Sequence, residues 1–311
     1  MRVVFLGTPD FAVASLDAIH NSSHEVVAVV TVPDRQAGRG QKVVYSPVKQ
    51  YALDHNLPLL QPERLRDPDF LEALQAFRAD IFVVVAFRML PEAVWNMPPH
   101  GTFNLHASLL PAYRGAAPIN WAIIRGEQLT GVTTFLLNHK IDEGNILLRA
   151  ETPINPDDNA GTLHDRLAAM GRDLVVRTLD GIADGTLHPT PQQGNPSTAP
   201  KIFKDDTRID FHQPGHRVVD FIRGLSPYPA ATLTLRSPDG QDVPFKIFEA
   251  SFTPAPETIA GTLVCDGKKT LKIAANDGFI HILSLQMSGK RKNHAEEFLC
   301  GKKISNWKLI T

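Results

Sequence analysis

The stretch RVVFLGTPDFAVASLDAIHNSSHEVVAVVTV, residues 2–32, decides the class of fold. Residues 2–7 form a short apolar run that ends in glycine, which is typical of a buried strand. Residues 10–20 have the pattern of a helix, and Asp10 stands where an N-cap is expected. Residues 25–32 are a run of β-branched side chains, typical of a parallel sheet covered on both faces. The stretch therefore predicts a β-α-β unit.

The same alternation continues to about residue 187. The apolar patterns predict helices at 46–56, 68–78 and 162–185, and strands at 57–62, 80–87, 101–108, 131–138 and 146–154. In the long last helix, Thr162 and Asp165 resemble a capping box. Alternating strands and helices favour an α/β domain with a Rossmann-like, doubly wound parallel sheet.

The composition changes after this domain. HPTPQQGNPSTAP, residues 188–200, contains four prolines and is typical of a linker. Short strands separated by turn residues follow it, at 231–235, 243–252, 261–265, 271–275 and 279–285. We therefore predict a catalytic domain over 1–187, a linker over 188–205 and a small OB-like β-barrel domain over 206–311.

Composition and charge exclude several classes of protein. The 311 residues are 43% apolar and 21% charged, with a formal net charge of −1, as in ordinary globular proteins. Residues 201–311 hold 16 Lys and Arg against 12 Asp and Glu, so a polyanion could bind the C-terminal third, or the excess could be chance. Two cysteines without metal spacing fit a reducing, cytoplasmic compartment. No apolar run predicts a signal peptide or a membrane span.

A second stretch suggests chemistry. FNLHASLLPAYRGAAP, residues 103–118, places Asn104 and His106 two positions apart. Side chains at i and i+2 share one face of a strand, so the amide and the imidazole would project side by side. Such a pair suits an oxygen that becomes negative during acyl transfer. A purely structural role is the commoner explanation of an isolated Asn-x-His.

Two further segments carry charge. In HKIDEGNILL, residues 139–148, Asp142 would hold a histidine protonated or collect a proton if it lay near that strand end. A solvated hairpin turn is the alternative. In PDRQAGRGQK, residues 33–42, the basic side chains suit a phosphate backbone, although a solvated loop explains them equally well. The dinucleotide fingerprint is missing, and no spacing suggests a metal or a nucleophilic triad.

These residues carry a resemblance. The chain resembles, from end to end, the 10-formyltetrahydrofolate-dependent formyltransferases, and among them the methionyl-tRNA formyltransferases. The matching pieces are GTPDFA at 7–12, PDRQAGRG at 33–40, SPVK at 46–49, VVVAF at 83–87, FNLHASLLPAYRGAAP at 103–118, GVT at 131–133 and IDEGN at 141–145. The Asn-x-His core with its downstream Asp is specific for the chemistry, whereas the basic PDRQAGRG segment resembles the insertion that grips the tRNA acceptor stem.

The resemblance assigns residues by motif match. It implies catalysis by Asn104, His106 and Asp142, with 10-formyltetrahydrofolate as co-substrate and no metal. The implied folate contacts are Ser108, Leu109, Leu110 and Pro111, with Phe87, Met89 and Leu90 in the pocket wall. The implied tRNA contacts are Arg35, Arg39 and Lys42, and the clustered Lys290, Arg291 and Lys292 are further candidates.

Two departures from the family pattern stand out. The VVVAF strand continues with Arg-Met-Leu-Pro, where many relatives have a longer Tyr-Gly-x-x-Leu-Pro, so the folate pocket wall is expected to differ there. The turn has Asp-Glu-Gly-Asn where relatives often have Asp-Thr-Gly-Asp, but the expected catalytic Asp is retained.

The implied function is transfer of the formyl group to the α-amine of initiator methionyl-tRNA, by a monomer that does not bind membranes. Three alternatives are weaker. A sugar amine or glycinamide ribonucleotide as acceptor would need neither the basic segment nor the barrel. A non-catalytic tRNA-binding protein would not need the intact Asn104, His106 and Asp142 set. An NAD-dependent enzyme would need the glycine fingerprint for dinucleotide binding, which this chain lacks.

Overall fold

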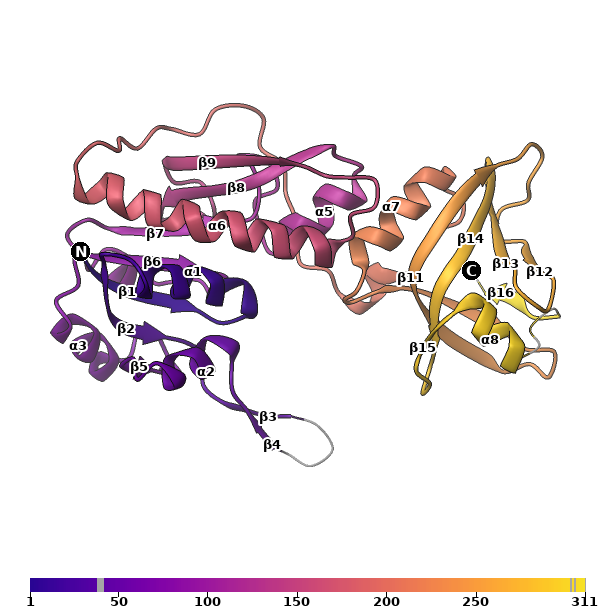
Figure 1. The fold of residues 1–311 in the computed structure, drawn as a ribbon, viewed down its shortest axis with the longest axis horizontal. Helices are drawn as coiled ribbons and strands as arrows, with labels where there is room; N and C mark the ends of the chain where they lie inside the picture. Colours follow the sequence, from indigo (N-terminus) through magenta and orange to yellow (C-terminus); the bar gives the residue numbers. More distant parts are fainter. Residues whose placement is uncertain (38–41, 303, 305, 311) are drawn as a thin grey trace. The chain divides into compact units, whose positions relative to one another are not determined.

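The structure is a computed structural model that describes residues 1–37, 42–302, 304 and 306–310. Contacts within the chain divide it into two compact units, which we call unit 1 and unit 2 (Figure 1). Unit 1 consists of Met1–Gly115, Leu129–Pro153 and His164–Ala199. Unit 2 consists of Ala116–Gln128, Ile154–Leu163 and Pro200–Thr311.

Unit 1 is built on a seven-stranded sheet in the order β5-β2-β1-β6-β7-β8-β9. Its strands are β1 Arg2–Gly7, β2 Glu25–Val30, β5 Leu59–Leu60, β6 Ile81–Val85, β7 Thr102–His106, β8 Leu129–Leu136 and β9 Ile146–Pro153. The strands from β5 to β7 pair in parallel, and β8 and β9 add an antiparallel edge. The predicted Rossmann-like α/β fold is confirmed, with a mixed rather than wholly parallel sheet.

Helices cover both faces of this sheet, as the continuous apolar strands require. Those of unit 1 are α1 Asp10–His20, α2 Pro47–Asp54, α3 Pro68–Ala76, α4 Glu92–Trp95 and most of α6 Ala160–Ala183. On one face, α3 and α4 bury Leu74 and Val94 against Leu6 and Val84 of the central strands. On the other face, α6 approaches β7 so closely that a Cβ at Gly171 would lie 2.5 Å from Leu105.

Two helix-capping predictions are wrong. Asp10 is the first residue of α1, and the residue before it, Pro9, makes no side-chain cap. The last helix begins at Ala160, two residues before the predicted capping box, and the side-chain oxygen of Asn159 accepts from the backbone N–H groups of Gly161 and Thr162. An Asn can accept from two orphan donors at once, and that bonding pattern prevailed over the Thr-x-x-Asp pattern.

The basic segment 33–42 contains the ends of a hairpin. β3 Arg35–Ala37 pairs antiparallel with β4 Lys42–Val44. At its base, the Lys49 ammonium lies 2.6 Å from the carboxylate of Asp34, which also accepts from the Gln61 amide at 2.9 Å. A hydrogen-bonded ion pair therefore holds the base of the hairpin.

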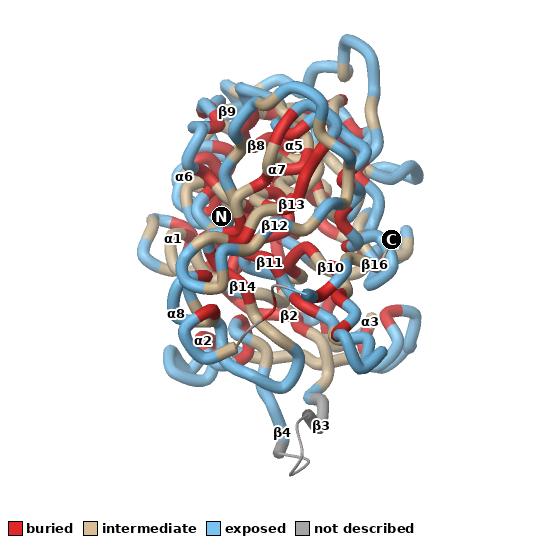
Figure 2. Tube along the Cα trace, turned by 90° about the vertical axis from the view of Figure 1, so that its right-hand side faces the viewer, coloured by how far each residue is buried: buried red, intermediate tan, exposed pale blue. Residues whose placement is uncertain are grey.

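Unit 2 contains a nearly closed, barrel-like antiparallel sheet in the order β12-β13-β14-β11-β10-β16, with β15 paired to β14. Its strands are β10 Ala231–Arg236, β11 Asp242–Pro254, β12 Leu263–Cys265, β13 Leu271–Ala275, β14 Gly278–Met287, β15 Lys292–His294 and β16 Lys308–Ile310. Figure 2 colours the chain by burial and marks buried positions along β10, β11 and β13. The predicted barrel is confirmed, and β15 and β16 are additional to the strands predicted.

The helices of unit 2 were not predicted. They are α5 Pro118–Ile124, α7 Gly215–Leu225 and α8 Ala295–Gly301, with a 3-10 turn at Lys204–Thr207. The long helix α7 buries Val218, Ile222 and Leu225 in the same core as the barrel strands. The sequence gives a weak helix signal here, because Gly215 and Gly224 lie near the two ends of α7 and glycine disfavours helices. Gly224 is nevertheless required, because a Cβ there would lie 2.6 Å from Ile124 of α5.

Candidate active site

Asn104 and His106 project from β7 on one face of the sheet. Asn104 lies between Val84 of β6 and Phe135 of β8, and His106 lies opposite Thr133. The alternation of the strand turns Phe103 and Leu105 to the other face, which agrees with the approach of α6 to Leu105. Asn104 is half-buried and His106 is only 6% exposed. The expected juxtaposition of amide and imidazole is therefore present.

The two ring nitrogens of His106 face different groups. Nε2 lies 2.8 Å from the carbonyl oxygen of Tyr113, and a carbonyl only accepts, so Nε2 carries the proton of that bond. Nδ1 lies 3.8 Å from the carboxylate oxygen Oδ2 of Asp142. The bond to Tyr113 therefore fixes the ring and leaves Nδ1 as the nitrogen that faces the acid.

Asp142 is held in place by its backbone and by a hydrogen bond. It lies in the turn between β8 and β9 with a φ of 53°, in the left-handed region that Asp tolerates better than most residues. Its Oδ2 accepts from the backbone N–H of Gly115 at 2.8 Å. Gly144 completes the turn, because a Cβ there would lie 1.6 Å from the carbonyl oxygen of Leu136. The segment 107–117 and the β8–β9 turn thus meet at this carboxylate.

A second group of side chains lies beside Asp142. The guanidinium of Arg114 is 3.1 Å from the carboxylate of Glu143 and also donates to the side-chain oxygen of Gln192 at 2.7 Å. Sequence reasoning found neither Arg114 nor Gln192. The only available signal was the Arg-Gly pair at 114–115, and nothing in the proline-rich segment 188–200 distinguished Gln192.

The predicted folate segment is largely packed into unit 1. Ser108 is buried, and its hydroxyl donates to the carbonyl oxygen of Ala112 at 2.6 Å. Leu110 and Pro111 are also buried, and Leu110 packs against Phe135 and Ile146. Leu109 is only partly buried. Of the four residues, Leu109 thus offers the most side-chain surface to a ligand, and the others shape the segment from beneath.

The three predicted wall residues after β6 do not share an environment. Leu90 is 8% exposed and belongs to the core beneath α3 and α4, and Phe87 packs against that core. Met89 is 71% exposed. The residue between Phe87 and Met89 in the sequence is Arg88. Its guanidinium lies over the Phe87 ring and donates to the carbonyl oxygens of Pro62 and Glu63. Burial lowers the pKa of Arg88.

The predicted tRNA-contacting cations occur in two segments. Arg35 and Lys42 lie on the paired strands of the β3–β4 hairpin, and Arg39 falls outside the described residues. Lys290 and Arg291 are exposed at the turn between β14 and β15. The Lys292 ammonium is 3.4 Å from the Glu249 carboxylate and 4.7 Å from the centre of the Phe248 ring. Lys292 thus already has an ion-pair partner and an aromatic partner within unit 2.

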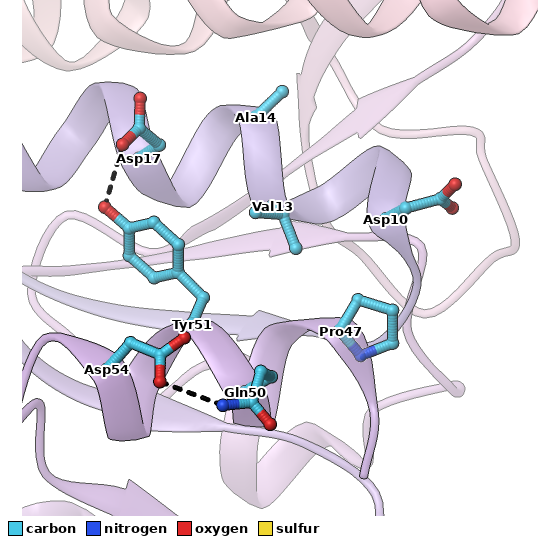
Figure 3. A pocket seen from close by; sticks show the side chains of 8 residues that line it. All are labelled: Asp10, Val13, Ala14, Asp17, Pro47, Gln50, Tyr51 and Asp54. Carbon is cyan, nitrogen blue, oxygen red and sulfur yellow. Dashed lines mark hydrogen bonds between the residues drawn. The ribbon is translucent and has the colours of Figure 1, made fainter. Parts of the chain in front are cut away.

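A shallow groove lies between α1 and α2, and none of the predicted site residues lines it (Figure 3). Its lining side chains are Asp10, Val13, Ala14, Asp17, Pro47, Gln50, Tyr51 and Asp54. The Tyr51 hydroxyl donates to Asp17 at 2.9 Å, and Gln50 donates to Asp54 at 2.9 Å. Burial, followed by the bond to Asp17, raises the pKa of Tyr51. The bond from Tyr51 to Asp17 links α2 to α1, whereas the bond from Gln50 to Asp54 lies within α2.

The described part of the chain has no grouping of side chains typical of a metal site and no membrane-spanning helix. Within it, no group of three or more His, Cys, Asp and Glu side chains is placed to hold a metal ion. No described helix is both long and apolar enough to cross a membrane.

Most of the chain matches a known family of proteins. The family described as "Formyl transferase" matches residues 1–179, and "Formyl transferase, C-terminal domain" matches residues 201–303. The chain belongs to the formyl transferase family, and it is an enzyme that transfers formyl groups.

The chain is similar over nearly its whole length to proteins named methionyl-tRNA formyltransferase. The chain is 54% identical over 307 residues to the methionyl-tRNA formyltransferase of Bacteroides fragilis (strain YCH46), covering 97% of this chain and 95% of that protein. It is 49% identical over 308 residues to the methionyl-tRNA formyltransferase of Flavobacterium johnsoniae, covering 98% of each chain.

Solved structures share the fold at lower identity. An N-formyltransferase from Helicobacter canadensis, in complex with folinic acid and dTDP-3-aminofucose, gives a TM-score of 0.66 at 21% identity, covering 94% of this chain and 99% of that chain. HypX from Aquifex aeolicus, in complex with tetrahydrofolic acid, gives 0.64 at 18% identity. That alignment covers 96% of this chain and 47% of HypX, so this chain spans about half the length of HypX.

Proposed function

We propose that this enzyme transfers the formyl group of 10-formyltetrahydrofolate to the α-amine of initiator methionyl-tRNA. The observation that carries the proposal is that Asn104 and His106 share one face of β7 and that Asp142 faces His106, in a chain whose relatives include methionyl-tRNA formyltransferases. The reaction forms a C–N bond to the α-nitrogen and breaks the bond between the formyl carbon and folate N10.

The mechanism follows from the charges that develop. The α-amine attacks in its neutral form, which is partly populated near pH 7. Attack turns the formyl oxygen into an oxyanion. Among the described residues, no protein group hydrogen-bonds the side-chain amide of Asn104, which leaves its N–H groups free to donate to that oxyanion. A preorganised donor of this kind contributes about 2.7–4 kcal/mol of transition-state stabilisation.

The orientation of His106 assigns its role to one nitrogen. Because Nε2–H donates to the Tyr113 carbonyl oxygen, Nδ1 is the atom that interacts with the reacting groups. Protonated at Nδ1, the ring donates to the oxyanion. The Asp142 carboxylate, 3.8 Å away, orients the ring and relays the proton that the amine loses. Folate N10 takes up a proton as it leaves.

The co-substrate would bind along the segment from Ser108 to Pro111. Leu109 offers a partly buried apolar surface to the pterin, while the buried Leu110 supports it from beneath. Phe87 and the exposed Met89 would contribute to the pocket wall, and Leu90 would act only through packing. An apolar wall excludes water, which protects the formyl group from hydrolysis.

The tRNA would be bound by basic side chains in two segments. Arg35, Arg39 and Lys42 of the 33–42 segment would contact the acceptor stem, and Lys290 and Arg291 of unit 2 would contact phosphates elsewhere. Lys292 would contribute less, because Glu249 already compensates its charge. The protein would act as a monomer in the cytoplasm, where charged initiator tRNA is used.

The decisive test offers several acceptors to the same enzyme. Purified protein is incubated with 10-formyltetrahydrofolate and, in parallel, initiator methionyl-tRNA, glycinamide ribonucleotide or a nucleotide-linked amino sugar. We expect formylated methionyl-tRNA and no other product. Transfer only to a small amine would keep the chemistry of Asn104 and His106 and would contradict the proposed acceptor.

A further inference from the structure

The side chain of Gln192 joins two loops of the candidate active site. Its Nε2 donates to the backbone carbonyl oxygens of Asp142 at 2.8 Å and Gly144 at 2.9 Å. Its Oε1 accepts from the guanidinium of Arg114 at 2.7 Å. Both N–H groups and the oxygen of the amide are therefore hydrogen-bonded. The three partners belong to Asp142, to Gly144 in the same turn, and to Arg114, which follows Tyr113.

The backbone around Gln192 is bonded to the same loops. Thr190 and Ile146 exchange two backbone hydrogen bonds, of 2.7 and 2.9 Å, just after the β8–β9 turn. Ser197 accepts from the backbone N–H of Tyr113 through its hydroxyl and from that of Arg114 through its carbonyl, each at 2.9 Å. The segment 190–199 is therefore anchored on both sides of Gln192 and belongs to unit 1.

These contacts fix the backbone at Asp142 and so the position of its carboxylate. Asp142 occupies the left-handed backbone region, which is sparsely populated and persists only where surrounding bonds fix it. Gln192 bonds the carbonyl of Asp142 itself, and Arg114 links Gln192 to Glu143 in the same turn. Tyr113, whose backbone N–H is bonded by Ser197, supplies the carbonyl that orients His106. The segment thus supports both members of the His106–Asp142 pair.

We propose that Gln192 is a positioning residue of the formyl-transfer reaction, held in place by the backbone hydrogen bonds of Thr190 and Ser197 on either side of it. Gln192 holds the turn at Asp142 in its reactive geometry and acts on the transition state only through that residue. The inference rests on the proposed function, because it requires Asp142 to act in catalysis.

The first test replaces the amide while keeping the length of the side chain. Gln192→Met removes all three hydrogen bonds, and we expect kcat to fall about ten- to a hundredfold, the cost of a misplaced catalytic group. Because the amide of Gln192 is bonded to protein groups at all three positions, KM for either substrate should change less than about threefold. The neighbouring Gln193 is exposed, so Gln193→Met is the matched control and should keep wild-type kcat.

A double-mutant cycle separates positioning from general damage. In an Asp142→Asn background, Gln192→Met should lower kcat by less than about threefold, since residues that act as a unit are not additive. A full loss in that background as well would overturn the proposal, as would a Gln192→Met variant that retains wild-type kcat. If Gln192→Met does not fold, Gln192→Glu, which loses only the two donated bonds, should show the same loss, and normal activity would overturn the proposal.

Hydrogen exchange provides a readout that needs no activity. The Gly115 amide donates to Asp142, so it should be protected in the wild type and in Gln193→Met, and exchange faster in Gln192→Met. Unchanged protection would overturn the positioning role. A wild type that forms no formylmethionyl-tRNA would refute the proposed function instead, and the exchange data would still report whether Gln192 orders the turn.

Discussion

The loops around His106 and the basic segments differ in how firmly their functional groups are held. His106 and Asp142 each have a hydrogen bond to the backbone, and the Gln192 amide supports the turn behind them. Lys290 and Arg291 are exposed side chains at a turn. Transition-state stabilisation needs groups in place before the reaction, whereas attraction between a cation and a phosphate tolerates loose geometry. The comparison predicts that changes in the loops affect kcat and changes in the basic segments affect tRNA binding.

The largest effect is expected at Asn104. Replacing it by Ala removes the proposed oxyanion donor and should lower kcat about 10²–10³-fold. Steady-state kinetics with both substrates varied would measure this, with KM for the tRNA nearly unchanged. Near-wild-type turnover in Asn104→Ala would remove Asn104 from the mechanism.

The next largest effect is expected at Gly144. An added Cβ would overlap the carbonyl oxygen of Leu136, so Gly144→Ala forces the β8–β9 turn to shift. We expect a loss of about 1–3 kcal/mol in the free energy of unfolding, together with reduced kcat, because Asp142 moves with the turn. Gly301→Ala is the control, since a Cβ there meets nothing within 4 Å. Equal stability of both variants in urea would contradict this role.

A smaller effect, on binding alone, is expected from the exposed cations. The double variant Lys290→Ala/Arg291→Ala should raise KM for the tRNA and lower the slope of log affinity against log salt by about one per lost phosphate contact. Lys292→Ala should change that slope less, because its ammonium is already paired with Glu249. A larger slope change in Lys292→Ala would reverse this ranking.

The smallest effect concerns the base of the hairpin. The hydrogen bond from Lys49, followed by that from Gln61, lowers the pKa of Asp34. A lowered carboxyl pKa stabilises the fold above the unfolded pKa, about 4, and that stability is lost as the pH falls through the folded value. The Tm deficit of Asp34→Asn should therefore be present at pH 6 and disappear in strong acid. Asp184→Asn, at an exposed position, is the control, and a deficit that grows toward low pH would contradict the assignment.

The sequence predicts the strands of unit 1 well because their apolar runs are long and buried on both faces, as at 25–30 and 81–85. It also predicts that Asn104 and His106 share a face, because strand periodicity alone determines this. The approach of Asp142 to His106 depends on how the β8–β9 turn folds back, which periodicity does not encode. Gln192 lies in a proline-rich segment whose composition is that of a linker, so its bonds are visible only in the structure.

In the proposed function, preorganised groups perform the chemistry while separate cations bind the polyanionic acceptor. The most direct test is the salt dependence of kcat and kcat/KM for wild-type transfer to initiator methionyl-tRNA. Between 50 and 200 mM salt, kcat/KM should fall at least about tenfold through loss of phosphate contacts, while kcat stays nearly constant. A flat kcat/KM would contradict binding of a tRNA, and a parallel fall in kcat would contradict the separation of the two regions.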